Sequence, residues 1–264
     1  MDRNKPEGKF ALVTGASSGI GKEYARELGS RGYGLVLVSN EEERIQEVGA
    51  ELAAEYGVDT YPLYMDLAVT DAAERLYAYC KERSLEIEVL VNNAGMFKLS
   101  KVVNLPVAVT EKMLLLHMVT PAMLCRYFGE DMKVRGRGYI LNMSSMSAWL
   151  SYPGISLYAS TKCFLKCFSR AFRLEMLDYG VYVTVLCPGA IATDLYHLSK
   201  RLQKLALRLG VMMTPQRLAR RAIRGMFRKR AWMMPGLVNY FFMFFLFFLP
   251  LGVVRWIMRK TKMI

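Results

Sequence analysis

Thr14-Gly-Ala-Ser-Ser-Gly-Ile-Gly21 is a glycine-rich loop that decides the fold, because of the segments on either side of it. The apolar run Phe10-Ala-Leu-Val-Thr14 leads into the loop and is typical of a buried parallel strand. A helix is expected to follow over residues 20–29. Three glycines at this spacing allow a tight turn and bring backbone N–H groups and a helix N-terminus toward a pyrophosphate. The loop predicts a dinucleotide site, with an ordinary glycine-rich turn as the alternative.

Further apolar runs recur along the chain with helical segments between them. Besides 10–14, strands are expected at residues 35–38, 61–65, 88–91, 139–145, 182–186 and 231–234. Alternating strands and helices favour a parallel sheet with right-handed crossovers. The sequence therefore predicts an α/β fold: a Rossmann-like doubly wound parallel sheet of about seven strands with helices on both faces, plus a C-terminal apolar helical extension. Ligands of such sheets bind beyond the carboxyl ends of the strands.

Tyr158-Ala-Ser-Thr-Lys162 places a tyrosine and a lysine one helical turn apart. The ammonium can stabilise a tyrosinate, whose ordinary pKa of about 10 has to fall for acid–base work near neutrality. Ser145 stands thirteen residues before the tyrosine and is placed to hold a substrate oxygen beside the phenol. Ser144 is the rival, but neighbouring residues of a strand face opposite sides. A lone Tyr-Lys pair is usually a surface pair, so the prediction depends on the combination of motifs.

Together these motifs resemble the short-chain dehydrogenase/reductase family. The resemblance runs over residues 9–236 and includes Asn92-Asn-Ala-Gly95 and Pro188-Gly189 followed by Thr193. It implies a nicotinamide cofactor and reversible carbonyl–alcohol chemistry, in which hydride transfer accompanies proton transfer by Tyr158. Within the family, the chain is similar to the branch of 3-ketosphinganine reductases, 3-oxoacyl reductases and hydroxysteroid dehydrogenases.

The resemblance also implies the residues that contact the cofactor. Asp66 would face the adenine, and Asn93 would line the cleft. Thr193 would contact the nicotinamide carboxamide, and Lys162 would hold the nicotinamide ribose as well as lower the tyrosine pKa. The full expected set is Thr14, Gly15, Ser17, Ser18, Gly19, Ile20, Gly21, Ser39, Asn40, Asp66, Leu67, Asn93, Ala94, Gly95, Tyr158, Lys162, Pro188, Gly189, Ile191 and Thr193.

The end of the second strand bears on the choice between NAD and NADP. An acidic residue there accepts the adenosine 2′-hydroxyl, whereas a basic one pairs with a 2′-phosphate. Ser39 occupies the usual acidic position, and Asn40 stands where many NADP-using relatives have arginine. We therefore expect NADPH, with NAD as the alternative. The following Glu41-Glu-Glu43 is interpreted as a helix N-terminus favoured by its dipole.

His117 is a departure from the family pattern. Many relatives have an asparagine at this point of the long helix, where it helps to hold a water in a proton relay. A histidine, with an ordinary pKa near 6.5, is able to relay protons itself; the alternative is a satisfied polar group on an apolar helix. We carry His117 as a catalytic candidate beside Ser145, Tyr158 and Lys162. The five cysteines show no metal spacing, and no metal site is expected.

The net charge of +13 belongs to the last part of the chain. Residues 195–264 carry fifteen Lys and Arg and no Asp or Glu, whereas residues 1–194 carry 21 basic and 23 acidic residues. An anionic membrane surface explains both this charge and the phenylalanine-rich block at residues 240–248. Nucleic acid is the alternative partner for a basic tail. The tail has no recognisable nucleic-acid motif, so we do not expect it to bind nucleic acid.

These features divide the chain. We expect a dinucleotide-binding catalytic domain at residues 1–236, with an amphipathic basic lid at 195–213, and a membrane-associating tail at 237–264. Thirteen helical residues before Pro250 span about 20 Å, short of the roughly 30 Å hydrocarbon core. Basic residues on both flanks of the apolar block argue against crossing. The prediction is peripheral or monotopic binding, with a kinked spanning helix or a dimer interface as alternatives.

Cysteines inside apolar segments and an N-terminus without an apolar signal region indicate a reduced compartment and the cytoplasmic face of a membrane. Apolar residues between Ser145 and Tyr158 favour a lipophilic substrate entrance. The sequence thus predicts an NADPH-dependent reductase acting on the keto group of a hydrophobic lipid, of 3-ketosphinganine or long-chain 3-oxoacyl type, in a homo-oligomer (dimer or tetramer). The alternatives are a hydroxysteroid or bile-acid dehydrogenase, and a non-catalytic nucleotide-binding membrane scaffold.

Overall fold

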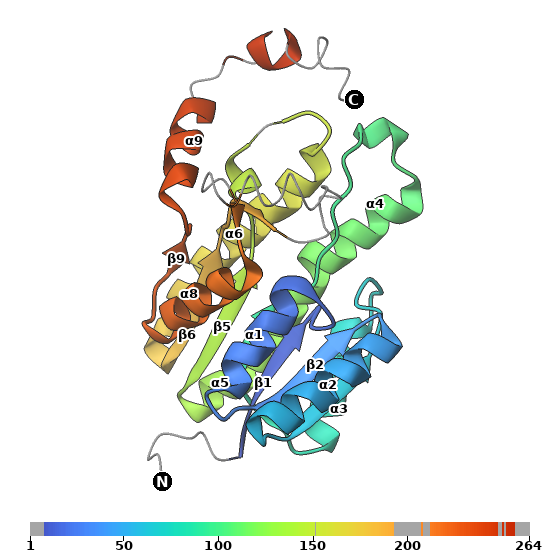
Figure 1. Ribbon diagram of the computed structural model, residues 1–264, viewed down its shortest axis with the longest axis vertical. Helices are drawn as coiled ribbons and strands as arrows, with labels where there is room; N and C mark the ends of the chain where they lie inside the picture. Colours follow the sequence, from blue (N-terminus) through green and yellow to red (C-terminus); the bar gives the residue numbers. More distant parts are fainter. Residues whose placement is uncertain are drawn as a thin grey trace.

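The protein was analysed as a computed structural model that describes residues 8–150, 152–192, 207, 212–247, 250 and 252–256. A seven-stranded sheet, parallel throughout, has the strand order β3-β2-β1-β4-β5-β6-β9 (Figure 1). Its strands are β1 Lys9–Thr14, β2 Gly34–Ser39, β3 Thr60–Tyr64, β4 Glu86–Asn92, β5 Gly138–Met143, β6 Val181–Leu186 and β9 Trp232–Met233. The expected Rossmann-like doubly wound sheet is therefore confirmed.

Two layers of helices sandwich the sheet, and each buries its own apolar cluster. One layer consists of α1 Gly19–Gly29, α2 Glu42–Tyr56 and α8 Pro215–Phe227. The other consists of α3 Ala72–Glu82, α5 Thr120–Arg135 and α6 Ser156–Met176. Shorter segments are α4 Val107–Leu114, the π-helical turn Leu115–Val119, the 3₁₀ turns Val102–Asn104, Met146–Trp149 and Leu177–Tyr179, and the two-stranded pair β7 Ala190–Ile191 and β8 Met212–Met213.

The fifth strand ends at Met143, two residues earlier than expected. Ser144 still donates its N–H to the carbonyl of Leu186 on the next strand. Ser145 leaves the ladder because it caps the 3₁₀ turn that follows: its Oγ accepts the N–H of Ser147 at 3.1 Å. Ser145 therefore lies just beyond the carboxyl end of β5, at the start of this turn.

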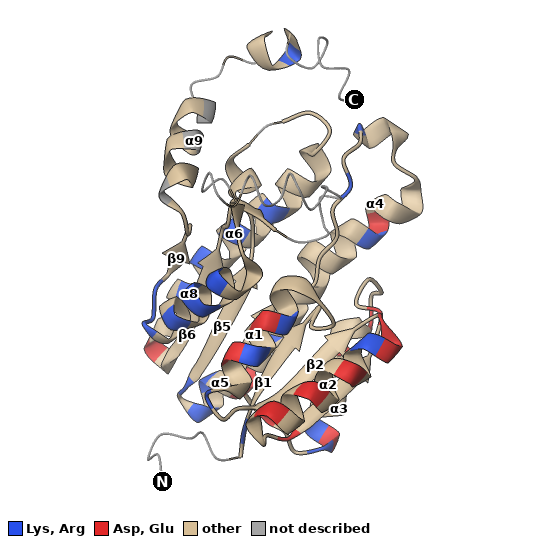
Figure 2. Cartoon of the chain, viewed as in Figure 1, with Lys and Arg blue, Asp and Glu red and all other residues tan. Residues whose placement is uncertain are grey.

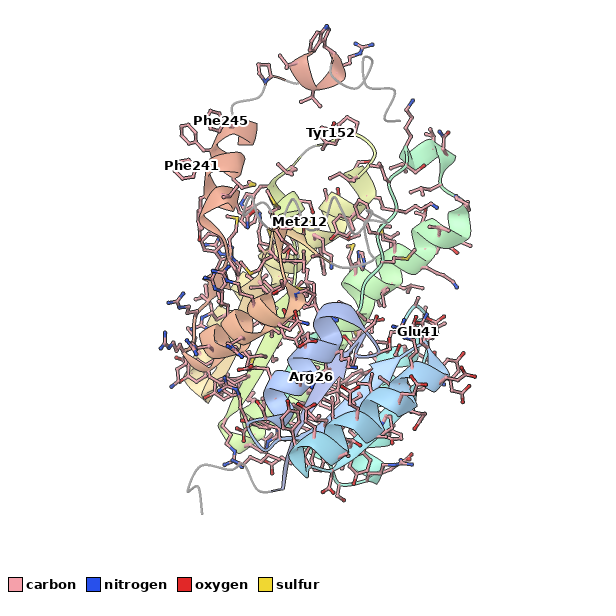
Figure 3. All side chains as sticks on the ribbon, in the orientation of Figure 1. Arg26, Glu41, Tyr152, Met212, Phe241 and Phe245 are labelled. Carbon is pink, nitrogen blue, oxygen red and sulfur yellow. The ribbon has the colours of Figure 1, made fainter. Side chains whose placement is uncertain are left out.

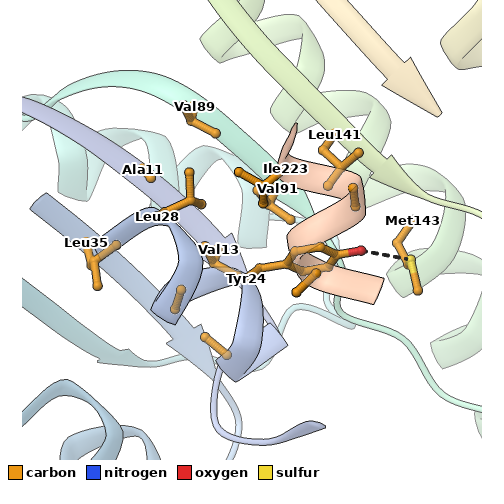
Figure 4. Close-up of a cluster of buried hydrophobic side chains, with 14 of the residues drawn as sticks. Ala11, Val13, Tyr24, Leu28, Leu35, Val89, Val91, Leu141, Met143 and Ile223 are labelled. Carbon is orange, nitrogen blue, oxygen red and sulfur yellow. Dashed lines mark hydrogen bonds between the residues drawn. The ribbon is translucent and has the colours of Figure 1, made fainter. Parts of the chain in front are cut away.

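Tyr24 joins helix α1 to the end of β5 through the core (Figure 4). The side chain is fully buried among residues such as Val13, Val91 and Ile223. Its hydroxyl donates to Sδ of Met143 at 3.6 Å, and burial raises the pKa of the phenol, so that Tyr24 stays neutral. The helix that follows the glycine loop is thereby held against the strand that leads to Ser145.

The C-terminal helix α9, Leu237–Phe247, runs away from the sheet after β9 (Figure 1). Its eleven residues amount to about 16 Å, about half of the hydrocarbon thickness. The base of α9 contacts the turn Met146–Trp149. An apolar helical extension is therefore present, whereas most of the expected lid at 195–213 lies outside the described residues.

By length and composition, one helix in the described part of the chain is able to cross a membrane, and it is Val107–Arg135 rather than α9. This continuous stretch contains α4, the π turn and α5. Its residues Leu124, Phe128 and Met132 are buried in the cluster against the sheet. We therefore interpret it as a helix of the fold.

Candidate active site

A cleft of about 660 Å³ lies at the carboxyl ends of the strands, where the sequence predicts a dinucleotide. Residues from nearly every expected motif line it. Of the predicted set, the lining includes Gly15, Ser17, Ser18, Gly19, Ile20, Gly21, Ser39, Asn40, Asp66, Leu67, Asn93, Ala94, Gly95, His117, Ser145, Tyr158, Lys162, Pro188, Gly189 and Ile191. Thr193 lies outside the described residues, and Thr14 lies behind the lining.

Thr14 acts from behind by tying the glycine loop to the end of β4. Its Oγ1 accepts the N–H groups of Asn93 at 2.9 Å and Ala94 at 3.0 Å. In return, Nδ2 of Asn93 donates to the carbonyl of Thr14 at 3.0 Å. Two of the predicted motifs therefore form one unit, in which Thr14 positions the loop from behind the cleft lining.

Gly15 and Gly21 are required because neighbouring backbone atoms leave no room for a side chain at either position. A Cβ on Gly21 would lie 1.8 Å from the carbonyl oxygen of Gly15, which no side chain can tolerate. Gly15 has φ of +66° and would place a Cβ 2.9 Å from Cα of Ala94. The loop thus packs directly against the first turn of α1 and presents backbone to the cleft, a surface that suits a pyrophosphate.

Helix α6 brings Tyr158 and Lys162 into the cleft. Lys162 is only 4% exposed, and its Nζ donates to the carbonyl of Met143 at 2.9 Å and lies 5.8 Å from the centre of the Tyr158 ring. Burial lowers the pKa of Lys162 to about 8. The hydroxyl of Ser144 donates to the carbonyl of Lys162 at 2.7 Å, so it anchors α6 to the end of β5. Both serines line the cleft, but the hydroxyl proton of Ser144 is engaged, which favours Ser145 as the serine that holds a substrate oxygen.

His117 is almost completely buried on the π turn, and both of its ring nitrogens have partners. Nε2 lies 3.0 Å from the N–H of Met96, and Nδ1 lies 2.9 Å from Oγ1 of Thr161. Thr161 donates its own proton to the carbonyl of Tyr158 at 2.8 Å, so the histidine carries its proton on Nδ1. Burial, and then the charge of Lys162, hold the pKa of His117 well below its ordinary value. The geometry favours a neutral, satisfied histidine that positions α6 over one that relays protons.

Glu41 is a cleft residue that the sequence analysis did not identify. It is the N-cap residue of α2, yet its carboxylate turns back and accepts the hydroxyl proton of Ser17 at 2.6 Å. Ser39 donates to the same Ser17 hydroxyl at 2.9 Å. The sequence does place Glu41 only two residues after Ser39, but the acidic run 41–43 is also what a helix N-terminus favours. An acidic group therefore stands beside the usual acidic position of the cleft.

Phe97 is a second residue that the sequence analysis missed. Its ring meets the Tyr158 ring edge-on at 5.1 Å. The apolar pair Met96-Phe97 directly after the Asn92-Asn-Ala-Gly95 motif was the signal for it. Trp149, from the turn after β5, lies under Nζ of Lys166 at 4.1 Å and against the ring of Trp232 at 6.0 Å. These rings lie against the cleft residue Tyr158 and on the turn that follows Ser145.

The sheet, the glycine cradle and the cleft define a Rossmann-type dinucleotide-binding protein. The sequence matches the family described as short chain dehydrogenase over residues 9–203. The chain therefore belongs to the short-chain dehydrogenase family, a class of NAD(P)-dependent oxidoreductases.

Individual relatives fall in the branch that the sequence predicts. The chain is 34% identical to the very-long-chain 3-oxoacyl-CoA reductase of Anas platyrhynchos, over 73% of this chain and 63% of that protein. It is 32% identical to the inactive hydroxysteroid dehydrogenase-like protein 1 of Homo sapiens, over 74% of this chain and 59% of that protein. The match thus spans about three-fifths of these relatives' length.

Among solved structures, the chain is similar to a short-chain dehydrogenase from Sphingobium yanoikuyae in complex with NADPH. The two are 29% identical, with a TM-score of 0.78 over 87% of this chain and 88% of that one. The expected family resemblance is therefore confirmed.

Proposed function

We propose that the protein reduces the keto group of a hydrophobic lipid with NADPH, and that the substrate is of long-chain 3-oxoacyl type. The observation that carries the proposal is the convergence of Ser145, Tyr158 and Lys162 on one cleft, beside a glycine cradle that a Cβ would fill. When bound, the cofactor supplies the hydride. Every remaining requirement is met by side chains of this chain.

In this proposal Tyr158 gives its phenolic proton to the substrate carbonyl oxygen, and Ser145 Oγ holds the same oxygen. Lys162 stabilises the phenolate that forms, because an ammonium one helical turn away favours the charged state. A lysine pKa of about 8 leaves most of this ammonium protonated at neutral pH. The ring of Phe97 against Tyr158, and the exposed Trp149 on the turn after Ser145, offer apolar surface to a lipid chain near the catalytic residues.

NADPH is proposed over NAD for two reasons. Ser39, a neutral residue, occupies the position where an acidic side chain would accept the 2′-hydroxyl of NAD. In addition, a structure 29% identical to this chain binds NADPH. Glu41 opposes this choice, but Nη1 of Arg44 lies 3.6 Å from its carboxylate and partly offsets the negative charge there. NAD remains the alternative cofactor.

We propose that α9 docks on the cytoplasmic face of a membrane and delivers the lipid. Its phenylalanines Phe241, Phe244 and Phe245 are between 62% and 69% exposed, and Phe241 and Phe245 project outward (Figure 3). A helix this short suits monotopic insertion. Because the base of α9 contacts the turn that carries Trp149, a docked helix places the entrance beside the bilayer. A homo-oligomer is also proposed, through the exposed Val134 and Leu174 of α5 and α6.

The test is oxidation of NADPH by the purified full chain with three ketones: a long-chain 3-oxoacyl thioester, 3-ketosphinganine and a ketosteroid. The proposal expects turnover that is fastest with the thioester and falls as its chain is shortened. Faster turnover of the ketosteroid would assign the hydroxysteroid alternative instead. Cofactor binding without turnover of any ketone would place the chain with its inactive relative as a scaffold.

A further inference from the structure

A second cavity, of about 310 Å³, lies between α8 and the base of α9. It shares no lining residue with the cofactor cleft. Arg221 and Arg224 reach it from α8, and Arg228 and Arg230 from the segment that leads to β9. Trp232 and Tyr240 provide an aromatic wall, with their rings edge-on at 6.1 Å. We call this cavity the arginine pocket.

The four arginines of the arginine pocket carry positive charge without an acidic partner among the described residues. In the described part of the chain, none of the four guanidinium groups has a carboxylate within 4.0 Å, whereas Arg220, on the same helix, pairs with Glu27. Lys229, between two of them, donates to the hydroxyl of Tyr182 and is not a pocket residue. Four like charges around one concavity repel one another unless an anion lies between them. A bound anion would therefore relieve the repulsion in this basic cluster, which lies along α8 and the segment after it (Figure 2).

Phosphate is the anion that this arrangement suits. Guanidinium groups donate two parallel N–H groups to phosphate oxygens, and several arginines on one anion surround it from different sides. All four arginines are exposed at their helix or loop, so an anion reaches them without any rearrangement of the core.

The position of the pocket indicates the source of the phosphate. Tyr240 of the wall lies on the first turn of α9, directly before the exposed Phe241 and one turn before Phe244. Tryptophan and tyrosine at the boundary between an apolar and a charged surface are typical of the headgroup region of a bilayer. We propose that the arginine pocket binds the phosphate of an anionic phospholipid headgroup while α9 enters the acyl region. This inference depends on the proposed membrane docking of α9 and identifies the lipid that it requires.

The experiment compares binding of the full chain to two vesicle types by co-sedimentation: pure phosphatidylcholine, and phosphatidylcholine with phosphatidylserine in a ratio of about 4:1. The test variant is R221Q/R224Q. Its matched control is R217Q/R220Q, which removes two charges from the same helix outside the pocket. At about 1 kcal/mol per surface arginine, the test variant is expected to bind the anionic vesicles roughly 30-fold more weakly. The control is expected to bind within a fewfold of the wild type.

Equal losses in the two variants would overturn the proposal, because general surface charge would then explain the binding. Inorganic phosphate is added to the protein bound to anionic vesicles, at a concentration equal to that of the lipid phosphate. If it releases the protein, the pocket binds a soluble anion, and the proposal is also overturned. Failure of the wild type to bind either vesicle type would instead reject the docking of α9. Turnover of a short, soluble ketone is measured in parallel. It tests the proposed chemistry independently of membrane binding, so the two failures can be distinguished.

Discussion

Nδ1 of His117 lies 2.9 Å from Oγ1 of Thr161, three residues after Tyr158 on the same helix. Through this contact and the bond from Met96 to Nε2, one buried imidazole links the loop after β4 to the helix that carries Tyr158 and Lys162. The histidine departs from the family's usual asparagine, and its two contacts favour a positioning role, in which it holds the loop after β4 and helix α6 in register.

A positioning role for His117 predicts a small effect on turnover and a clear effect on stability at low pH. In His117→Asn, activity should stay within a fewfold of the wild type, and the pH profile of kcat should not shift. Because the folded imidazole resists protonation, the unfolded chain alone takes up this proton below pH 6.5. The wild type should therefore lose about 1.4 kcal/mol per pH unit relative to the variant as the pH falls below 6.5.

Urea unfolding at several pH values measures this difference. A loss in kcat confined to one limb of the pH profile of His117→Asn would support the proton relay and contradict the positioning role.

The burial of Lys162 predicts a pH dependence of stability with the same sign, but in the alkaline range. Burial depresses its pKa to about 8 in the folded protein, whereas an unfolded lysine titrates near 10.4. Between these values the unfolded chain keeps a proton that the folded chain has released, so folded stability rises with pH. Relative to Lys162→Met, the cofactor-free wild type should gain up to about 3 kcal/mol between pH 8 and pH 10.4. A stability difference that stays flat over this window would contradict the buried, charged lysine.

Gly189 and Asn239 connect the cofactor cleft to the C-terminal helix. A Cβ on Gly189 would lie 2.2 Å from Oδ1 of Asn239, whose Nδ2 donates to the carbonyl of Pro235 at 2.6 Å. Gly189→Ala should therefore destabilise the protein by about 1–3 kcal/mol and weaken substrate binding, since the base of α9 has to move. In an Asn239→Ala background the same substitution should have little effect.

Chemical denaturation of the wild type, the two single variants and the double variant measures this coupling. Additive effects in the double variant would show that α9 does not rest on the Pro188-Gly189 loop.

Removal of the charge of Glu41 should change the preference of the protein between NADPH and NADH. Its carboxylate, held by Ser17, repels a 2′-phosphate but accepts a 2′-hydroxyl. Glu41→Gln should raise the ratio of kcat/KM with NADPH to that with NADH by about tenfold, equivalent to 1.4 kcal/mol. Glu43→Gln is the matched control, because Glu43 belongs to the same acidic run but does not line the cleft. An equal ratio in the two variants would remove Glu41 from the cofactor site.

The fold and most of the cleft were predictable because they depend on local patterns. Apolar runs separated by helical segments specify a parallel sheet, and the ends of its strands bring the motifs together. Thr14 and Asn93, far apart in sequence, meet because β1 and β4 are neighbours in the sheet.

What sequence could not predict are contacts set by side-chain direction. Glu41 looks like any acidic residue at a helix start, and only the coordinates show that it turns back to Ser17. The tautomer of His117 likewise depends on Thr161, whose own proton is engaged by a backbone carbonyl. The arginine pocket requires the base of α9 to be placed near α8. None of these relationships leaves a periodic signal in the chain.

The central claim is that Tyr158 is the proton donor in reduction of a long-chain 3-oxoacyl thioester. The most direct measurement is single-turnover oxidation of NADPH by the wild type and by Tyr158→Phe, with cofactor affinity measured in both. The account predicts a loss of about 10²–10⁴-fold in the rate of the variant with an unchanged dissociation constant for NADPH. A variant that turns the thioester over at the wild-type rate would contradict it.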